Sequence, residues 1–122
     1  MTNDRSKTQE ITLKSKLEII WPKVKYQYKF KNCIFDFILF ERSIIFEAKL
    51  NKNAFSREQY DKYTKALPSY NIIYLIGLDE LGYIEDNVNY TMKTTKISSD
   101  IDEFKQQILF INKVIYELKQ LI

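Results

Sequence analysis

The pattern of hydrophobic and polar positions begins with a helical period. Between Ser6 and Ile20, the apolar residues Leu13, Leu17 and Ile20 recur at the three- and four-residue spacing of one helix face. Pro22 follows, and the residue before a proline is disfavoured in the helical region of backbone space. The sequence therefore predicts a first helix from about Ser6 to Ile20.

The pattern then changes to the two-residue period of a strand. Residues 24–30 alternate between apolar or aromatic and polar side chains, which predicts a half-buried strand with one basic, solvent-exposed face. Residues 33–40 and 43–50 are rich in β-branched and aromatic side chains and are nearly continuous in hydrophobicity. Because only Glu41 and Arg42 separate them, these two runs are interpreted as a hairpin with both faces largely buried.

The second half of the chain predicts a helix, a strand and a final helix. Ser56 resembles an N-cap of a helix that runs through Leu67, and residues 71–76 form a short apolar strand. Residues 78–96 are weakly patterned, and their structure is left open. Ser98 or Ser99 is predicted to cap a helix over residues 100–121.

The last helix carries a long apolar seam at alternating spacings of three and four. Its members are Ile101, Phe104, Ile108, Ile111, Ile115, Leu118 and Ile122. This seam can pack against the sheet of its own domain, and Leu109, Phe110 and Val114 widen the apolar arc. Two apolar surfaces suggest two contacts, so we expect a homodimer with this helix in the interface.

The order of elements predicts an α/β fold in which helices flank a mixed sheet, with a long C-terminal helix. Two glycines and two prolines are the only strong breakers, and no repeat or linker is present. Residues 1–122 are therefore expected to form a single domain. No apolar run approaches the roughly 20 residues of a membrane span, so we expect a soluble, intracellular protein without a membrane partner.

The composition excludes several kinds of site. With no histidine and only Cys33, the chain lacks the ligands of structural zinc and the partners of serine or cysteine triads. Any metal ion would be bound by oxygen, which favours magnesium, manganese or calcium. The net charge of +3 is compatible with nucleic-acid binding, although many unrelated proteins share it. Lysines concentrate in the first third, at Lys14, Lys16, Lys23, Lys25, Lys29 and Lys31.

The hairpin brings two carboxylates together. If Glu41 and Arg42 form the turn, continued pairing places Asp36 opposite Glu47, where the Cβ atoms of a pair lie about 5 Å apart. Like charges at that distance are destabilising unless a cation lies between them. Lys49 lies two residues beyond Glu47 and projects on the same face. The alternative is a solvent-exposed face on which these are ordinary surface residues.

These residues resemble the signature of the PD-(D/E)XK nucleases. Asp36, ten intervening residues and then Glu47-Ala48-Lys49 lie, as in that family, on two consecutive core strands, although Phe35 replaces the proline before the aspartate. Gln59 and Tyr63 are similar to the Gln-x-x-x-Tyr element of RecB-like members. The start of the same helix, Ser56 to Gln59, resembles VRR-NUC-type members and resolvase-like relatives. The resemblance covers about residues 10–76.

The resemblance also suggests further site residues. The resemblance implies that Glu10 faces the metal as the first-helix glutamate of resolvase-like relatives does. The alternatives are Glu18 in that role and an ordinary solvated glutamate at residue 10. Gln59 and Tyr63 share a helix face that is either part of the active site or a half-buried polar stripe. Gln27 is interpreted as a surface residue.

The family resemblance implies metal-dependent hydrolysis of phosphodiester bonds. One or two Mg²⁺ ions, which Mn²⁺ could replace, would be held by Asp36, Glu47, the carbonyl of Ala48 and Glu10, with Lys49 beside the attacking water. The expected activity is a DNA endonuclease, either structure-selective like junction resolvases or site-specific. The alternatives are a catalytically silent nuclease fold used for nucleic-acid binding or assembly, and an RNA endonuclease, which would normally want a histidine.

Overall fold

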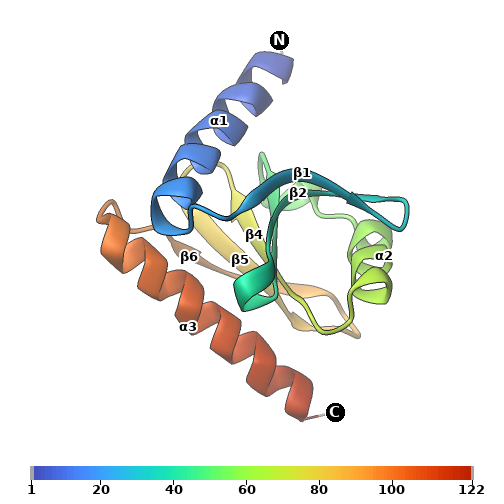
Figure 1. Cartoon of the computed structure of the whole chain (residues 1–122). Helices are drawn as coiled ribbons and strands as arrows, with labels where there is room; N and C mark the ends of the chain where they lie inside the picture. The colour runs from blue at the N-terminus through green and yellow to red at the C-terminus, as the bar shows by residue number, and fades with distance from the viewer. Residues whose placement is uncertain (1, 122) are drawn as a thin grey trace.

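The computed structural model describes residues 2–121, with side chains from Lys7 onward. Its centre is one mixed sheet of six strands in the order β1-β2-β3-β4-β5-β6, in which β3 and β4 are parallel and all other neighbours are antiparallel (Figure 1). The strands are β1 (Lys25–Phe30), β2 (Cys33–Leu39), β3 (Ile44–Lys49), β4 (Asn71–Ile76), β5 (Glu80–Asp86) and β6 (Thr91–Lys96). The helices are α1 (Thr2–Ile20), α2 (Arg57–Ala66) and α3 (Ile101–Gln120), with short 3-10 turns η1 (Phe40–Arg42) and η2 (Lys52–Ala54). The expected α/β fold with a long C-terminal helix is confirmed.

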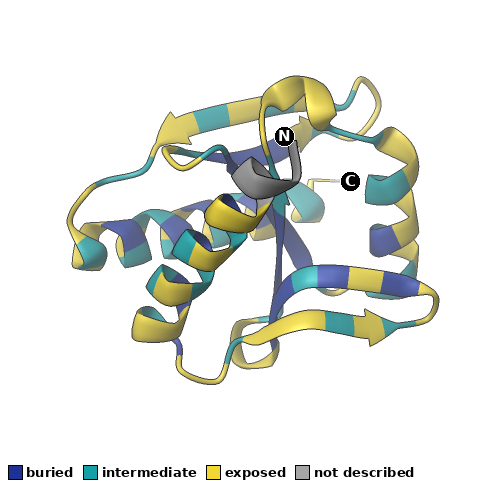
Figure 2. Cartoon of the chain, turned by 90° about the horizontal axis from the view of Figure 1, so that it is seen from above, coloured by how far each residue is buried: buried dark blue, intermediate teal, exposed yellow. Residues whose placement is uncertain are grey.

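Helices cover both faces of the sheet. Helices α1 and α3 pack on one face, and α2, which connects the parallel strands β3 and β4, packs on the other (Figure 1). The buried residues concentrate on the central strands and on the inward sides of the helices (Figure 2). Strand β4 is buried along its whole length. The sheet is therefore a rigid support with two separate apolar layers, and polar groups on its inner strands are held away from bulk water.

The ends of the helices follow local sequence signals, with one correction. Helix α1 ends before Trp21 as expected, and the Ser56 hydroxyl accepts a hydrogen bond from Gln59 N at 3.1 Å at the start of α2. The cap of α3 is Asp100, so the prediction of Ser98 or Ser99 is wrong. A carboxylate can accept from two orphan amides, and Asp100 accepts from the backbone of Asp102 and Glu103, whereas the Ser98 hydroxyl pairs with Glu103.

The β2–β3 hairpin has the expected register but a longer turn. Leu39 pairs with Ile44 and Phe37 with Phe46, which is the pairing that the two-residue turn predicts. The connection, however, is the 3-10 turn η1 followed by Ser43 in the left-handed region, with a φ of 54°. The prediction of a two-residue turn is therefore wrong. The register is the same because the longer turn takes one residue from each strand, Phe40 and Ser43, out of the hydrogen-bonded pairing.

The segment that the sequence left open forms a hairpin. Strands β5 and β6 pair over residues 80–96 and extend the sheet beyond β4. Strand β6 forms one edge of the sheet and is largely exposed, which explains why residues 91–96 carry no clear hydrophobic pattern. Within residues 2–121, no helix is both long and apolar enough to cross a bilayer.

The apolar seam of α3 packs against its own domain. Phe104, Ile108, Ile111 and Ile115 are buried beneath the sheet, and Leu109 and Val114 pack against the same core. Ile122 lies outside the described residues. One of the two expected contacts, the contact with the sheet of the same domain, is therefore formed, and the expected homodimer stays a prediction. Among the residues that widened the arc, Phe110 alone is exposed, at 68%.

Candidate active site

The candidate site lies where the β1–β2 hairpin bends. Side chains two residues apart normally project to the same face of a strand, yet Phe35 packs in the layer beneath α2 and Phe37 packs beneath α1 and α3. Opposite this break, Gln27 has a φ of 52°, which interrupts regular pairing between its neighbours in β1. Asp36 lies between the two phenylalanines, so the bend sets where its carboxylate projects.

Both oxygens of Asp36 have hydrogen-bond donors. Its Oδ2 accepts from the backbone N of Ala48 at 2.9 Å, and its Oδ1 accepts from Gln27 Nε2 at 3.2 Å. The bond to Ala48 ties the carboxylate to β3, directly beside Glu47. The sequence expectation that Asp36 and Glu47 lie side by side on neighbouring strands therefore agrees with the register and with this contact.

Glu47 is a buried carboxylate with two partners. It is 5% exposed. Its Oε2 lies 3.5 Å from the Nζ of Lys49, and its Oε1 lies 3.2 Å from the hydroxyl of Tyr63. That hydroxyl also donates to the carbonyl of Ile34 at 2.7 Å, which links α2 to β2. Lys49 therefore sits beside the carboxylates, as strand alternation predicted.

The electrostatics of the pair favour a cation. Burial and the neighbouring charge of Asp36 raise the pKa of Glu47 to about 7, against the opposing effect of Lys49. Burial also raises the pKa of Asp36, although the Ala48 amide opposes the shift and the charge of Glu10 adds to it. One lysine therefore does not compensate the charges of the buried Glu47 and the partly buried Asp36. A divalent cation would favour the ionised form of both.

The raised pKa of Glu47 predicts that the metal-free fold loses stability as pH rises. Between about pH 4.5 and 7 the unfolded chain has released this proton while the folded protein retains it, so the free energy of unfolding falls by up to roughly 1.4 kcal/mol per pH unit. Above about pH 7 the loss is complete. Urea unfolding in EDTA at several pH values measures this slope.

The matched variants for this measurement are Glu47→Gln and Glu85→Gln. The first removes the buried carboxylate and is expected to flatten the slope, whereas the second removes a carboxylate that is 46% exposed on β5 and is expected to leave it unchanged. A Glu47→Gln protein with the wild-type slope would show that Glu47 does not titrate in this range.

The donor set suits a small hard cation. Mg²⁺ is bound in proteins through one or two carboxylates and keeps several waters, so Asp36 and Glu47 provide enough protein ligands. Among the described residues, no three acidic or other metal-ligating side chains come together. This arrangement fits Mg²⁺ or Mn²⁺ better than Ca²⁺, which takes six to eight oxygen ligands.

Glu10 lies near this pair but is engaged elsewhere. Its Oε2 accepts from the Tyr26 hydroxyl at 2.7 Å, and this bond, with burial and the charges of Glu10 and Asp36, raises the pKa of Tyr26 to about 12. The role of Glu10 as a metal ligand stays a prediction, and its charge reaches Asp36. The alternative, Glu18, is exposed and lies 3.7 Å from Lys14 on the same helix.

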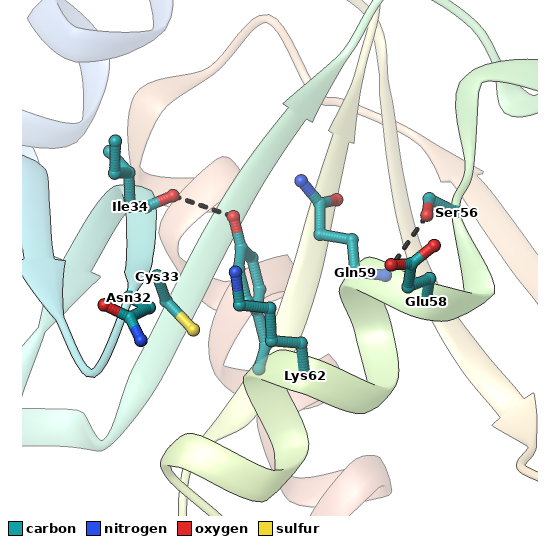
Figure 3. Close-up of a pocket in the computed structure, with 8 residues that line it drawn as sticks. Asn32, Cys33, Ile34, Ser56, Glu58, Gln59 and Lys62 are labelled. Atoms are coloured by element: carbon teal, nitrogen blue, oxygen red, sulfur yellow. Dashed lines mark hydrogen bonds between the residues drawn. The ribbon is translucent and has the colours of Figure 1, made fainter.

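Gln59 and Tyr63 both line a cleft beside the site, between α2 and the start of β2 (Figure 3). It has a volume of about 390 Å³. Tyr63 connects the cleft to Glu47 through its hydroxyl, whereas the buried Oε1 of Gln59 has no hydrogen-bond partner among the described residues. The other residues that line the cleft are Asn32, Cys33, Ile34, Ser56, Glu58 and Lys62.

The sequence missed two residues that hold the site in place. Gln27 is exposed, as expected, but it donates to Asp36. Gln9 is buried, and its Nε2 donates to the carbonyls of Lys49 at 2.9 Å and Gly77 at 2.7 Å, which fixes α1 to the ends of β3 and β4. The sequence gives no signal for the role of Gln9, since helical spacing identifies the apolar face of a helix and not which polar residue is buried.

Comparison with known proteins yields no assignment. No family model, no curated protein and no solved structure matches this chain. The function is therefore argued from the chemistry of the site.

Proposed function

We propose that this protein is a metal-dependent nuclease of the PD-(D/E)XK type that hydrolyses phosphodiester bonds of DNA. The observation that carries the proposal is the arrangement of Asp36, Glu47 and Lys49. The buried Glu47 and the partly buried Asp36 lie side by side on adjacent strands, and the ammonium of Lys49 lies 3.5 Å from Glu47. Without a cation, such a pair of carboxylates destabilises the fold. Natural proteins keep destabilising groups of this kind mainly at functional sites.

The chain's own residues divide the chemistry as follows. Asp36 and Glu47 would hold Mg²⁺ or Mn²⁺, which when bound polarises the phosphate and lowers the pKa of a water molecule. The Ala48 amide and Gln27 orient Asp36 through its two oxygens. Lys49 orients the attacking water or stabilises the additional negative charge on the phosphate oxygens in the transition state. Attack of the water oxygen on phosphorus forms one P–O bond and breaks the bond between phosphorus and the leaving deoxyribose oxygen, the attacking water losing a proton and the leaving oxygen taking one up from solvent.

Basic residues near the site support a nucleic-acid substrate. Lys25 and Lys29 are exposed on β1 on either side of Gln27, which itself contacts Asp36. Lys23 and Lys31 are exposed at the two ends of the same strand. A phosphate backbone that follows this edge of the sheet would reach the carboxylates. The lysines of this strand would contact phosphate groups, and such contacts do not distinguish one base from another. This favours recognition of DNA structure over DNA sequence.

DNA binding is expected to weaken steeply with salt, because each phosphate contact releases counterions. The logarithm of the binding constant falls with the logarithm of salt concentration by roughly 0.9 per contact on duplex DNA. The double variant Lys25→Gln, Lys29→Gln should reduce this slope by about 2 and weaken binding in low salt. Fluorescence anisotropy with a labelled duplex in EDTA measures both quantities.

The control for that experiment is Lys105→Gln, Lys113→Gln, which removes the same charge from α3. It is expected to change the slope little, because α3 packs on the opposite side of the sheet from α2. Equal effects of the two double variants would argue against β1 as the DNA-contacting edge. A wild-type affinity that barely depends on salt would argue against nucleic acid as the substrate.

Cutting both strands of a duplex or junction in a concerted manner calls for two copies of this site, so we propose a homodimer as the active form. The exposed Phe110 and Tyr116 on α3 are the apolar side chains that this helix leaves available for such a contact.

A further inference from the structure

The hydroxyl of Tyr74 is buried without a partner. Tyr74 lies in β4 and is 0% exposed, with its ring in an edge-on contact with Phe55 at 5.5 Å between centroids. Its hydroxyl has no hydrogen bond to any of the described residues. A buried phenol without a partner is destabilising compared with phenylalanine at the same position, so its presence calls for a function.

The register of the sheet places this side chain next to Glu47. Strands β3 and β4 are parallel, and Glu47 pairs with Tyr74 across the ladder, so both project into the layer beneath α2. Burial and the charge of Glu47 both raise the pKa of Tyr74 well above its usual range. The hydroxyl therefore keeps its proton and can act only as a neutral hydrogen-bond donor or acceptor.

The neighbouring tyrosine hydroxyls of this layer already have acceptors. Tyr60 donates to Asn87 Oδ1 at 2.7 Å, and Tyr63 donates to the Ile34 carbonyl at 2.7 Å. Among Tyr60, Tyr63 and Tyr74, Tyr74 is the one whose proton has no acceptor among the described residues. The Tyr74 hydroxyl is therefore a free hydrogen-bond donor in the layer that contains the carboxylate of Glu47.

We propose that Tyr74 is a positioning residue of this site, and that its hydroxyl donates a hydrogen bond to the Glu47 carboxylate in the metal-loaded protein. The inference rests on the proposed function, because it assigns Glu47 as a metal ligand. A donor on one carboxylate oxygen directs the other oxygen toward the cation, as outer-shell partners commonly do. Tyr74 does not touch the substrate and acts through Glu47.

The test is Tyr74→Phe, which keeps the ring and its contact with Phe55. In EDTA the variant is expected to melt a few degrees above the wild type, because it loses an unpaired buried hydroxyl. Calorimetric titration with Mg²⁺ alone, without DNA, is expected to give a dissociation constant about 10-fold higher than that of the wild type. A tyrosine with a purely structural role would leave Mg²⁺ binding unchanged.

Tyr83→Phe is the matched control, since Tyr83 is a mostly buried tyrosine in the opposite apolar layer. It is expected to bind Mg²⁺ like the wild type. Wild-type Mg²⁺ affinity in Tyr74→Phe would overturn the inference and leave the proposed function intact. A lower melting temperature of Tyr74→Phe in EDTA would also overturn it, since the hydroxyl would then have a partner in the free protein. A wild type that does not bind Mg²⁺ would refute both the inference and the proposed function.

Discussion

Replacing either carboxylate by its amide, in Asp36→Asn or Glu47→Gln, is expected to reduce Mg²⁺-dependent DNA cleavage by at least about 100-fold. Loss of an outer-shell partner alone typically lowers metal affinity or activity by about 10- to 100-fold, and these two residues are the proposed ligands themselves. Both amides keep the size of the side chain. The metal-free melting temperature of Glu47→Gln should equal or exceed that of the wild type at pH 8, because burial disfavours the ionised carboxylate there.

Single-turnover cleavage of a labelled duplex and a four-way junction measures the first effect, and thermal unfolding in EDTA measures the second. Glu85→Gln is again the control, since it removes a carboxylate on β5 that is 46% exposed and pairs with Lys93. Cleavage by Glu47→Gln at the wild-type rate would contradict its assignment as a ligand. Unfolding of either amide variant under conditions where the wild type is folded would point to a structural role instead.

Lys49→Met is expected to lower the cleavage rate at saturating Mg²⁺ and DNA by about 100- to 1,000-fold. Removal of one donor to the developing charge of a transition state typically has an effect of this size. The side chain of Lys49 is 15% exposed, and methionine retains most of its apolar contacts. Because the interaction is proposed to be strongest in the transition state, the loss should appear in kcat more than in KM.

The control for Lys49 is Lys52→Met, which removes an exposed ammonium a few residues later, in η2. This variant is expected to alter DNA affinity in low salt only slightly and to leave kcat unchanged. If Lys49→Met instead raised KM alone, Lys49 would contribute ground-state binding of the DNA and not the chemical step. A normal kcat in Lys49→Met would contradict its proposed catalytic role.

The sequence predicted most elements because each has a strong local signal. Apolar spacing, Pro22 and the Ser56 cap define α1 and α2, and the β-branched run of residues 71–76 is β4. The β5–β6 hairpin was not predicted, because an edge strand such as β6 is exposed on most of its positions and carries no two-residue pattern. The cap of α3 was assigned to the wrong residue because serine and aspartate at residues 98–100 all suit an N-cap.

The core of the site was predictable, and its supporting contacts were not. Strand alternation and register are enough to place Asp36, Glu47 and Lys49 together. The bend at Gln27 and Asp36 depends on packing of Phe35 and Phe37 in different layers, which no local pattern encodes. The hydrogen bond from Tyr26 to Glu10 likewise depends on how α1 lies over the β1–β2 hairpin.

The wide apolar arc of α3 shows the limit of reasoning from one helix. Its spacing correctly indicates that one face must be covered, but it does not identify the partner. The sheet of the same domain provides that partner for Ile108, Ile111 and Ile115. A dimer therefore needs a contact other than the seam, and Phe110 and Tyr116 are the exposed apolar side chains of this helix.

The measurement that tests the central proposal most directly is cleavage by the wild type of labelled duplex, single-stranded and four-way-junction DNA, alongside RNA. Reactions with Mg²⁺, with Mn²⁺ and with EDTA would be compared for the wild type and Asp36→Asn from parallel purifications. We predict cleavage of DNA in Mg²⁺ or Mn²⁺, none in EDTA, and at least a 100-fold slower reaction with Asp36→Asn. Absence of cleavage of every substrate in Mg²⁺ and Mn²⁺, or equal cleavage by Asp36→Asn, would contradict the account.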